Sequence, residues 1–356
     1  MLKQLLICAL LQYAALAQTE RRNVLDFGAV PNDGKDDTAA FQAAFDSLDP
    51  HAGGTVYCPP GQYDIFGQIT VNGDAVRLMG DGGPSYNEDD HPSGCSLWGH
   101  TDGMTLLRFD GVTLQHRGPI VEYVNFRDVT PTGHTATLLE IRLFNRWTVR
   151  NVSVNYAKVG LRVDAVNDDA SWGYVAQMVC KASNICIEQA ATEGGFLLLG
   201  GNLEPLQVGV RARGPQVRIM GVKFDCPGGS TGVYTTGDSD VVMGSLFEQC
   251  GMGVKIQDDG HYPVSGKFNH VIGNHFRGWD GGPNKGVEVC ATCDNTQLMG
   301  NTYEAVTLHV DDRSQTTYRY EQDMGVSAAL NCPAGQAIRS ITVKQGIVTA
   351  VNCGAP

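Results

Sequence analysis

A short pattern of apolar and polar positions recurs from the middle of the chain onward. A strand-like segment leads to Asn or Gly, an apolar residue follows three positions later, and a turn then leads to Gly-apolar-x-apolar. Clear copies are VRIMGVKFDCPGGSTGVYT and VVMGSLFEQCGMGVKIQ. Aligning the copies gives two columns. The turn column is Asn151, Asn184, Gly221, Gly244, Gly273 and Gly300, and the apolar column is Val154, Ile187, Phe224, Phe247, Phe276 and Tyr303, with Phe126 from an earlier copy.

This repeat predicts an all-β solenoid over residues 50 to 312. Units of this size, each with two or three short strands, bury a core only by stacking on their neighbours. Side chains alternate between the two faces of a strand, so we expect the aromatic column inside the stack. Asn and Gly in the turn column suit a left-handed backbone. A β-sandwich with coincidental spacing is the alternative, and it explains neither column.

Both ends of the chain depart from the repeat. Residues 1–17 have one Lys, a short apolar run and a final Ala-Leu-Ala, which is the pattern of a cleaved signal peptide. The run is too short to span a bilayer as a helix. Residues 314–356 contain two alternating segments around Gly346, flanked by Cys332 and Cys353. We expect a small disulfide-closed β appendage that covers the last coil of a solenoid domain over residues 18–313.

The net charge limits the possible binding partners, and the cysteines limit the possible cellular compartment. The net charge of −12 argues against nucleic acid and anionic membranes as partners. It also repels a polyanion unless positive charge is concentrated locally. Eleven cysteines are present, and removal of Cys8 with the signal peptide leaves an even number. For an extracellular or periplasmic protein we expect disulfides. Besides Cys332–Cys353, the expected pairs are Cys226–Cys250, Cys58–Cys95, Cys180–Cys186 and Cys290–Cys293.

The segment VLDFGAVPNDGKDDTAAFQAAFDS, residues 24–47, and the following GGTVYCPPGQYDI resemble the entry of the pectate-lyase superfamily. This superfamily of right-handed parallel β-helices includes polygalacturonases, rhamnogalacturonase-like enzymes, uronan epimerases and phage tailspikes. The resemblance implies an N-terminal capping helix, started by Asp36 or Asp37, with Phe41 and Phe45 on its buried face. It also implies action on a polysaccharide substrate.

In polygalacturonases the substrate lies along the sheet formed by the Gly-apolar-x-apolar strands. The resemblance therefore directs attention to the outward residues of those strands. The first column is Glu140, Arg162, Leu197, Tyr234, Lys255, Glu288 and Thr307, and the second is Arg142, Asp164, Leu199, Thr236, Gln257, Cys290 and His309. Tyr234, Lys255 and Glu288 lie on consecutive coils about 4.8 Å apart, so they can act on one sugar unit as base, acid and charge stabiliser. A surface charge ladder without catalytic function is the alternative.

The catalytic carboxylates of polygalacturonases have no match here. Thr231, Gly251 and Met252 occupy the positions of their aspartates, and Asn284-Lys285-Gly286 replaces the Gly-His-Gly motif. Other acids follow the same strands, and we take Asp238, Asp258 and Asp259 as further catalytic candidates because closely spaced carboxylates shift each other's pKa. Together with Asp240 and Asp294, they could instead hold calcium or simply form turns. We expect no metal at Cys290 and Cys293 and no cofactor, with calcium as the alternative.

Two tryptophans indicate the edges of the groove. Trp172 follows the strand GLRV, and Trp279 precedes the strand GVEV. Indole rings in loops stack well on sugar rings. We expect these two residues, with Arg162, Asp164 and Lys285, to bind the polymer, whereas Trp147 lies within a strand and is expected to be structural.

Three functions are compatible with these residues. The first is a secreted hydrolase or lyase that cuts an extracellular polymer, which can contain uronates. The second is a non-catalytic carbohydrate-binding solenoid, favoured by the missing carboxylates. The third is an epimerase or a tailspike-type depolymerase.

Overall fold

The computed structural model describes residues 21–83, 94–111, 117–130, 132–164, 172–190, 194–260, 266–278, 284–314, 316–320, 337–344 and 347–354. For residue 320 and for residues 337–354 only the backbone is described. The expected signal peptide, Trp279 and Cys332 lie outside the described residues.

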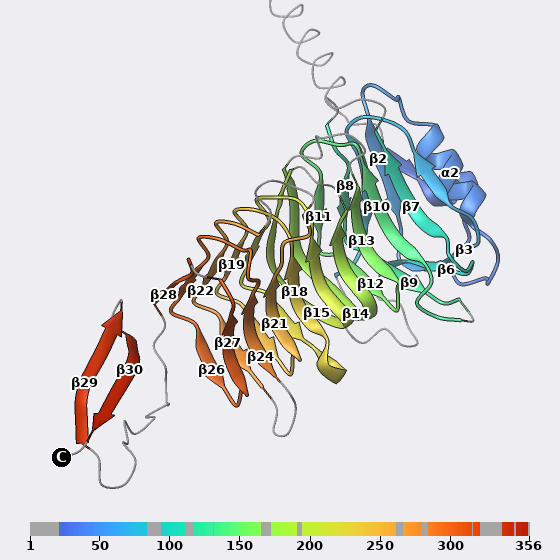
Figure 1. Cartoon of the computed structure of the whole chain (residues 1–356). Coiled ribbons are helices and arrows are strands. Elements are labelled where there is room, and N and C mark those ends of the chain that lie inside the picture. The colour runs from blue at the N-terminus through green and yellow to red at the C-terminus, as the bar shows by residue number, and fades with distance from the viewer. Residues whose placement is uncertain are drawn as a thin grey trace, which may run out of the picture.

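The chain winds into a right-handed parallel β-helix in which each coil adds one strand to each of three sheets (Figure 1). Sheet 1 contains β1 (Arg21–Asn23), β2 (Gly54–Cys58), β5 (Val76–Gly80), β8 (Ile120–Glu122), β11 (Thr148–Arg150), β16 (Arg218–Met220), β19 (Val241–Met243), β22 (His270–Ile272), β25 (Gln297–Met299) and β28 (Tyr318–Tyr320). Sheet 2 contains β3 (Gly61–Ile65), β6 (Cys95–Gly99), β9 (Val124–Asp128), β12 (Ser153–Asn155), β17 (Lys223–Asp225), β20 (Leu246–Glu248), β23 (His275–Arg277) and β26 (Thr302–Glu304).

Sheet 3 contains β4 (Ile69–Val71), β7 (Thr105–Asp110), β10 (Thr137–Arg142), β13 (Val159–Asp164), β18 (Thr231–Thr235), β21 (Met252–Ile256), β24 (Lys285–Val289) and β27 (Leu308–Asp312). Two long strands, β14 (Gly173–Gln189) and β15 (Phe196–Ala212), bend through all three sheets. The described neighbours within each sheet pair in parallel, so the coils stack one on the next from end to end.

The aromatic column lies inside the stack, on sheet 2, as expected. Phe224, Phe247, Phe276 and Tyr303 stack with ring centroids 4.7, 4.7 and 5.2 Å apart. Phe126 belongs to the same column and is fully buried. The strand register connects it to Phe224 through Val154, Cys180 and Leu203.

The expected turn column is correct except in one coil. Asn151, Gly221, Gly244, Gly273 and Gly300 all have positive φ, between 51° and 65°. Asn184 does not belong to this column, because it lies at the corner between sheets 2 and 3, where its N–H donates to the carbonyl of Ala157. Gln177, with φ of 51°, occupies the turn of that coil. Ile187 accordingly lies in sheet 3, paired with Leu161 and Val210. The error arises because the turn of this coil between sheets 1 and 2 carries Gln177 in place of Gly or Asn, whereas Asn184 lies at the next corner of the same strand.

The glycines of sheet 3 pack directly against the aromatic rings of sheet 2. A β-carbon on Gly232 would lie 2.6 Å from the ring of Phe247, and one on Gly253 would lie 2.4 Å from the ring of Phe276. Four sheet 3 glycines therefore leave room for the aromatic ring of the following coil, namely Gly209, Gly232, Gly253 and Gly286. In the last coil His309 stands at the glycine position and stacks on Tyr303 with ring centroids 4.6 Å apart. His309 thus packs against the aromatic column and is not an outward groove residue.

A short helix, α2 (Thr38–Asp46), closes the N-terminal end of the stack (Figure 1). Phe41, Ala44 and Phe45 are buried against the first coils, as the amphipathic pattern predicts. Asp37 stands at the start of the helix, but its carboxylate accepts hydrogen bonds from the N–H groups of Val30 and Asp64. The carboxylate of Asp36 accepts the N–H of Thr38 at 2.9 Å.

Four of the expected disulfides are present. They are Cys58–Cys95, Cys180–Cys186, Cys226–Cys250 and Cys290–Cys293. Cys58–Cys95 and Cys226–Cys250 each connect neighbouring coils, whereas Cys290–Cys293 closes a single turn.

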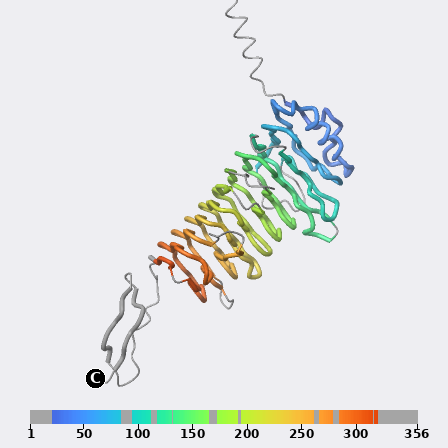
Figure 2. The backbone as a smooth tube through the Cα atoms, turned by 45° about the horizontal axis from the view of Figure 1, so that its top comes forward, coloured from blue at the N-terminus to red at the C-terminus, as the bar shows by residue number. Residues whose placement is uncertain are grey.

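The parallel stack continues beyond the expected limit at residue 313, since β28 still pairs with β25. The tail then forms an antiparallel hairpin of β29 (Ala337–Lys344) and β30 (Ile347–Gly354), which confirms the two expected strands. Figure 2 shows the coils of the solenoid stacked along one axis. That the hairpin covers the last coil stays a prediction. The pairing of Cys353 with Cys332 stays a prediction. No helix in the described part of the chain has the length and apolar character to cross a membrane.

Candidate functional site

The outward side chains of sheet 3 form one continuous column along the stack. The register of the strands gives its members in order as Arg108, Glu140, Arg162, Glu188, Arg211, Tyr234, Lys255, Glu288 and Asp311. We call this set the outer column. Tyr234, Lys255 and Glu288 are neighbours on consecutive strands, as expected. Leu197 and Thr307 are not members, because Leu197 lies in the sheet 1 part of β15 and Thr307 precedes β27.

The first part of the outer column alternates in charge and is internally paired. Arg108 binds Glu140 with N and O atoms 2.7 Å apart. Arg162 lies between Glu140 at 3.7 Å and Glu188 at 3.9 Å, and also binds Asp164 at 3.2 Å. These contacts place Arg162 and Asp164 in a surface ion-pair ladder. Their expected role in polymer binding stays a prediction.

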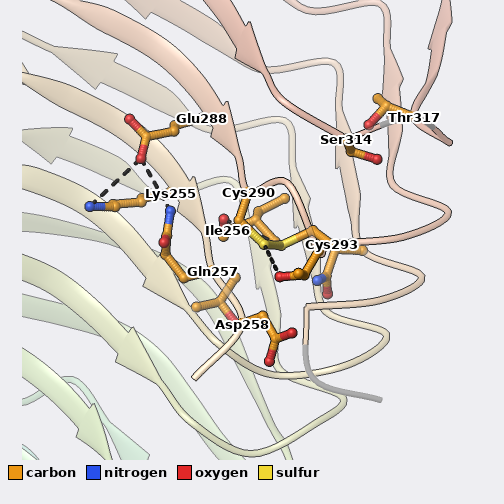
Figure 3. Close-up of a disulfide and its surroundings, with 12 residues drawn as sticks. Lys255, Ile256, Gln257, Asp258, Glu288, Cys290, Cys293, Ser314 and Thr317 are labelled. Carbon is orange, nitrogen blue, oxygen red and sulfur yellow. Dashed lines mark hydrogen bonds and ion pairs between the residues drawn. A yellow bond between two sulfur atoms is a disulfide. The ribbon is translucent and has the colours of Figure 1, made fainter. Parts of the chain in front are cut away.

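A second network surrounds Glu288. Its carboxylate lies 3.7 Å from the Lys255 ammonium and accepts hydrogen bonds from Gln257 at 3.1 Å and Lys285 at 3.0 Å. Figure 3 shows Lys255 and Gln257 pointing toward Glu288 from the neighbouring strand, while Asp258 points away. Lys285 also binds Asp311 at 2.8 Å. Hydrogen bonds from Arg313 and Lys285 lower the pKa of Asp311 to about 2. These contacts fix the position of Glu288 and suit it to orient Lys255.

Tyr234 lies in the outer column between these two networks and interrupts its alternation of opposite charges. Arg211 binds Glu188 at 3.3 Å on one side, but its neighbour on the other side is the uncharged phenol. The Lys255 ammonium lies 5.8 Å from the centre of the Tyr234 ring, within range of a cation–π interaction. Val159, Ile185 and Val208 form a small apolar cluster on the outer face, and the ring packs on it.

A hollow of about 570 Å³ opens at this interruption. It is lined by Ala190, Val208, Arg211, Arg213, Tyr234, Thr236 and Asp259. Among the described residues, the Tyr234 hydroxyl has no hydrogen-bond partner and Arg213 makes no ion pair. The hollow therefore offers a guanidinium and a phenol hydroxyl to a ligand, beside a second guanidinium that is already paired.

The predicted acids are spread around this region. Asp259 lines the hollow and accepts a hydrogen bond from the Thr236 hydroxyl at 3.0 Å. Asp258 does not line it, and its carboxylate accepts the N–H of Gly260. Asp238 lies in the turn after β18, where burial raises its pKa. Asp240 is buried in the same turn, and burial raises its pKa to about 7.

Two further acids are held by hydrogen bonds in turns. Asp240 accepts hydrogen bonds from the Thr235 hydroxyl and the Val217 N–H, and Asp294 accepts one from the Thr316 hydroxyl. Within the described ranges no three His, Cys, Asp or Glu residues are grouped so that they could hold a metal ion. These hydrogen bonds fit the turn-forming alternative, and calcium binding stays a prediction that the described residues do not decide.

The tryptophans have different environments. Trp147 is buried, as expected. Trp172 is 57% exposed, and its backbone N–H donates to Gly195 at the corner where the chain passes from sheet 3 to sheet 1. An exposed indole at this corner is consistent with the expected sugar platform, which stays a prediction.

Three members of this region were not expected from the sequence. Glu188 and Arg211 belong to the outer column, and Arg213 lines the hollow. A signal was present, because Gly209-Val210-Arg211-Ala212 is itself a Gly-apolar-x-apolar copy. It was overlooked because the preceding Gly195-Phe196-Leu197-Leu198 fits the same pattern but belongs to sheet 1. The second outward column is corrected in the same way, with Ala190 and Arg213 in place of Leu199 and Arg313 in place of His309.

Comparisons with known proteins find relatives of this chain. A family model described as rhamnogalacturonase A/epimerase, pectate lyase-like, matches residues 21–91. Mannuronan C5-epimerase AlgE3 of Azotobacter vinelandii is 53% identical over 45 residues, which are 13% of this chain and 2% of that protein. The sequence match thus spans a very small part of the curated relative.

Two solved structures resemble the whole solenoid. ORF18 of Geobacillus virus E2 has a TM-score of 0.67 and 18% identity, covering 90% of this chain and 65% of that chain. The Streptococcus pneumoniae surface adhesin PfbA has a TM-score of 0.54 and 15% identity, covering 85% of this chain and 92% of that chain. Identities this low show the fold alone. Together with the stacked parallel sheets, they show that the fold is a right-handed parallel β-helix, and the entry segment over residues 21–91 matches the pectate lyase-like family model.

Proposed function

We propose that this chain acts outside the cell on a carboxylate-bearing polysaccharide, bound in the hollow around Tyr234. The observation that carries the proposal is the interruption of the ion-pair ladder. Arg108, Arg162 and Arg211 all pair with glutamates of the outer column, whereas Arg213 stands unpaired within the described chain beside an unbonded phenol hydroxyl. An ion-pair ladder that served only solubility would be expected to continue through this position.

Positive charge is concentrated at the hollow, although the chain as a whole is acidic and would repel a polyanion. The chain as a whole carries −12, which repels a polyanion. Arg211 and Arg213 line the hollow, and Lys255 is the next residue of the outer column after Tyr234. Arg211 and Arg213 face a cavity in which field lines are focused, and Lys255 adds positive charge beside it, so a sugar carboxylate can be held there despite the acidic surface. Guanidinium groups also bind carboxylates in a bidentate manner.

This set of groups suits removal of a proton adjacent to a carboxylate. A cation that neutralises the uronate carboxylate makes the C5 proton more acidic, and a tyrosine phenolate can accept that proton. The phenol so formed can donate the proton to the departing C4 oxygen, which cleaves the chain and leaves a C4–C5 double bond. If water instead delivers a proton to the opposite face of C5, the configuration is inverted and the chain stays intact. We propose Tyr234 as the proton-transfer group, Arg213 as the neutraliser and Lys255, oriented by Glu288, as the second cation.

Hydrolysis has less support. Hydrolysis of a glycosidic bond ordinarily requires two carboxyl groups that flank it. Of the described residues lining the hollow, Asp259 is the single carboxylate. Glu288 is held by Lys255, Gln257 and Lys285 and its side chain is 9% exposed.

The comparisons support a polysaccharide substrate, and the disulfides support a location outside the cell. A relative over 45 residues is named for action on mannuronan. The four disulfides suit an oxidising compartment. A non-catalytic carbohydrate-binding function is the second candidate, favoured by the lack of a carboxylate pair among the described residues lining the hollow and by the fold shared with a surface adhesin.

Proton NMR in D₂O tests the proposal and separates the alternatives. Polymannuronate, polygalacturonate and a neutral glucan are each incubated with the full chain. New olefinic signals indicate a lyase, and deuterium at C5 without chain cleavage indicates an epimerase. Tyr234→Phe and Arg213→Ala should abolish either signal, whereas Arg277→Ala, an exposed cation on sheet 2, should not. New reducing ends without olefin would overturn proton abstraction in favour of hydrolysis. Binding without any chemistry would establish the second candidate.

A further inference from the structure

A second group of side chains, mostly aromatic, lies at the other end of the solenoid, on sheet 2 and at the corner that leads to sheet 3. It comprises Phe66, Trp98, His100, Arg127 and Tyr156, which we call the aromatic stripe. Trp98 lies in β6 and Arg127 in β9, while Phe66, His100 and Tyr156 directly follow β3, β6 and β12. The stripe therefore crosses four successive coils, a length of roughly 15 Å at the spacing of neighbouring strands.

The exposed end of the stripe is rigid. Phe66 is 44% exposed, yet its backbone N–H donates to the Thr38 hydroxyl and its carbonyl accepts the Thr101 hydroxyl at 2.6 Å. Its ring stacks on the imidazole of His100, with centroids 4.4 Å apart and an interplanar angle of 4°. His100 in turn contacts the buried carboxylate of Asp64 at 2.6 Å. An aromatic ring is thus held in a fixed orientation in water, so a ligand that stacks on it loses little free energy in ordering it.

The rest of the stripe is a second fixed stack. The Arg127 guanidinium lies 4.9 Å from the Trp98 ring centre and 4.9 Å from the Tyr156 ring centre. The Trp98 indole N–H donates to the Ser96 hydroxyl at 2.9 Å, which fixes the plane of the ring. Both rings are partly exposed. Trp98 therefore belongs to an ordered surface platform and not to the core.

The chemistry around the stripe differs from that of the hollow. Carboxylates flank it, namely Asp36 beside the Phe66 backbone and Asp102, whose pKa the Thr132 hydroxyl lowers. A polyanion gains little there. A pyranose ring fits better, because its apolar C–H face stacks on a fixed aromatic ring while its hydroxyls donate to neighbouring carboxylates. The stripe also continues toward the hollow, since Val159 of the cluster under Tyr234 follows Tyr156 by three residues.

We propose that the aromatic stripe is an auxiliary polysaccharide-binding platform that grips pyranose faces by stacking. It goes beyond the proposed function and requires no catalysis in the hollow. Recognition by stacking predicts binding that is insensitive to salt, whereas binding of a carboxylate polymer in the hollow weakens as salt screens the charges.

Affinity electrophoresis of the full chain in gels containing hydroxyethyl cellulose or polymannuronate, at low and high salt, tests the platform. Phe66→Ala and Trp98→Ala should each weaken binding of the neutral polymer about tenfold at both salt concentrations. Trp98→Phe should restore most of it. Tyr318→Ala, a comparably exposed aromatic on sheet 1, should bind like the wild type. Thermal unfolding of each variant verifies that the fold is intact.

The outcomes separate the two sites. Retention of neutral-polymer binding in Phe66→Ala and Trp98→Ala overturns the platform, as does a wild type that binds no neutral polymer. Self-association abolished by these variants would assign the stripe to a contact between copies and would also overturn it. Loss of C5 chemistry in Tyr234→Phe with intact neutral-polymer binding supports two independent sites. Absence of C5 chemistry in the wild type would refute catalysis in the hollow without affecting the platform.

Discussion

The ring of Phe247 lies against the backbone of Gly232 with no space for a methyl group between them. The contact repeats between neighbouring coils and ties the apolar column of sheet 2 to the glycine column of sheet 3. Gly232→Ala should therefore lower the free energy of unfolding by about 1–3 kcal/mol through overpacking, and Phe247→Ala by about 3–5 kcal/mol through cavity formation. Urea denaturation measures both. Gly83→Ala, at a site with open space, is the control and should change little. A stable Gly232→Ala variant would contradict the described packing.

The disulfides should contribute unequally to stability. Cys226 and Cys250 are 24 residues apart and connect neighbouring coils, whereas Cys290 and Cys293 are three residues apart. Because a cross-link restricts the unfolded chain more when it closes a longer loop, replacing both Cys226 and Cys250 with Ala should cost about 2–4 kcal/mol. The same replacement at Cys290 and Cys293 should cost clearly less. Peptide mapping without reduction should recover both pairs, and free thiols at Cys226 and Cys250 would contradict the assignment.

Asp240 should make stability depend on pH. Burial raises its pKa from 3.8 to about 7 in the folded chain, so between these values the folded state binds a proton that the unfolded state has lost. Its contribution is then fully present below about pH 4 and is lost as the pH rises through about 7. Asp240→Asn keeps an oxygen for the Val217 N–H and carries no charge. Its melting temperature should vary less over this range than that of the wild type. An unchanged pH profile would show that Asp240 does not titrate there.

Replacement of Lys255 should lower catalytic turnover while changing the stability of the fold little. Its side chain is 34% exposed, and Glu288 keeps Lys285 and Gln257 as partners when it is removed. Lys255→Met should thus change the free energy of unfolding by less than about 1 kcal/mol. If Lys255 is the second cation of the site, turnover should fall at least about a hundredfold. Lys223→Met, a similarly exposed lysine on sheet 2, is the matched control. Full activity of Lys255→Met would leave the outer column as a charge ladder only.

Much of the fold could be predicted because the packing rule is local and depends on two residue types. Each coil between residues 216 and 310 shows an aromatic residue on sheet 2 and, except the last, a glycine on sheet 3, so the stack and the neighbourhood of Tyr234, Lys255 and Glu288 followed from the pattern. The coils of β14 and β15 lack the aromatic residue on sheet 2 and carry Cys180 and Leu203 instead. There the pattern gave the wrong register.

The site was less predictable for a physical reason. Whether a charged side chain is free or paired depends on its neighbours in the adjacent coils, which are about 20 or more residues away in a solenoid of this kind. Arg162 was expected to bind the polymer and lies between Glu140 and Glu188, which the sequence pattern did not indicate. Arg213 was not among the expected residues and lines the hollow. The interruption at Tyr234 becomes visible only once Arg211 and Lys255 are placed on either side of it.

The stacking of His309 on Tyr303 has a consequence for the size of the molecule. The imidazole occupies the space that the aromatic ring of a following coil would fill. A further coil of the same kind, whether from this chain or from another molecule, would find that space taken. One side chain at a glycine position thus acts as a stop signal, which limits the length of the solenoid and removes a template for end-to-end polymerisation.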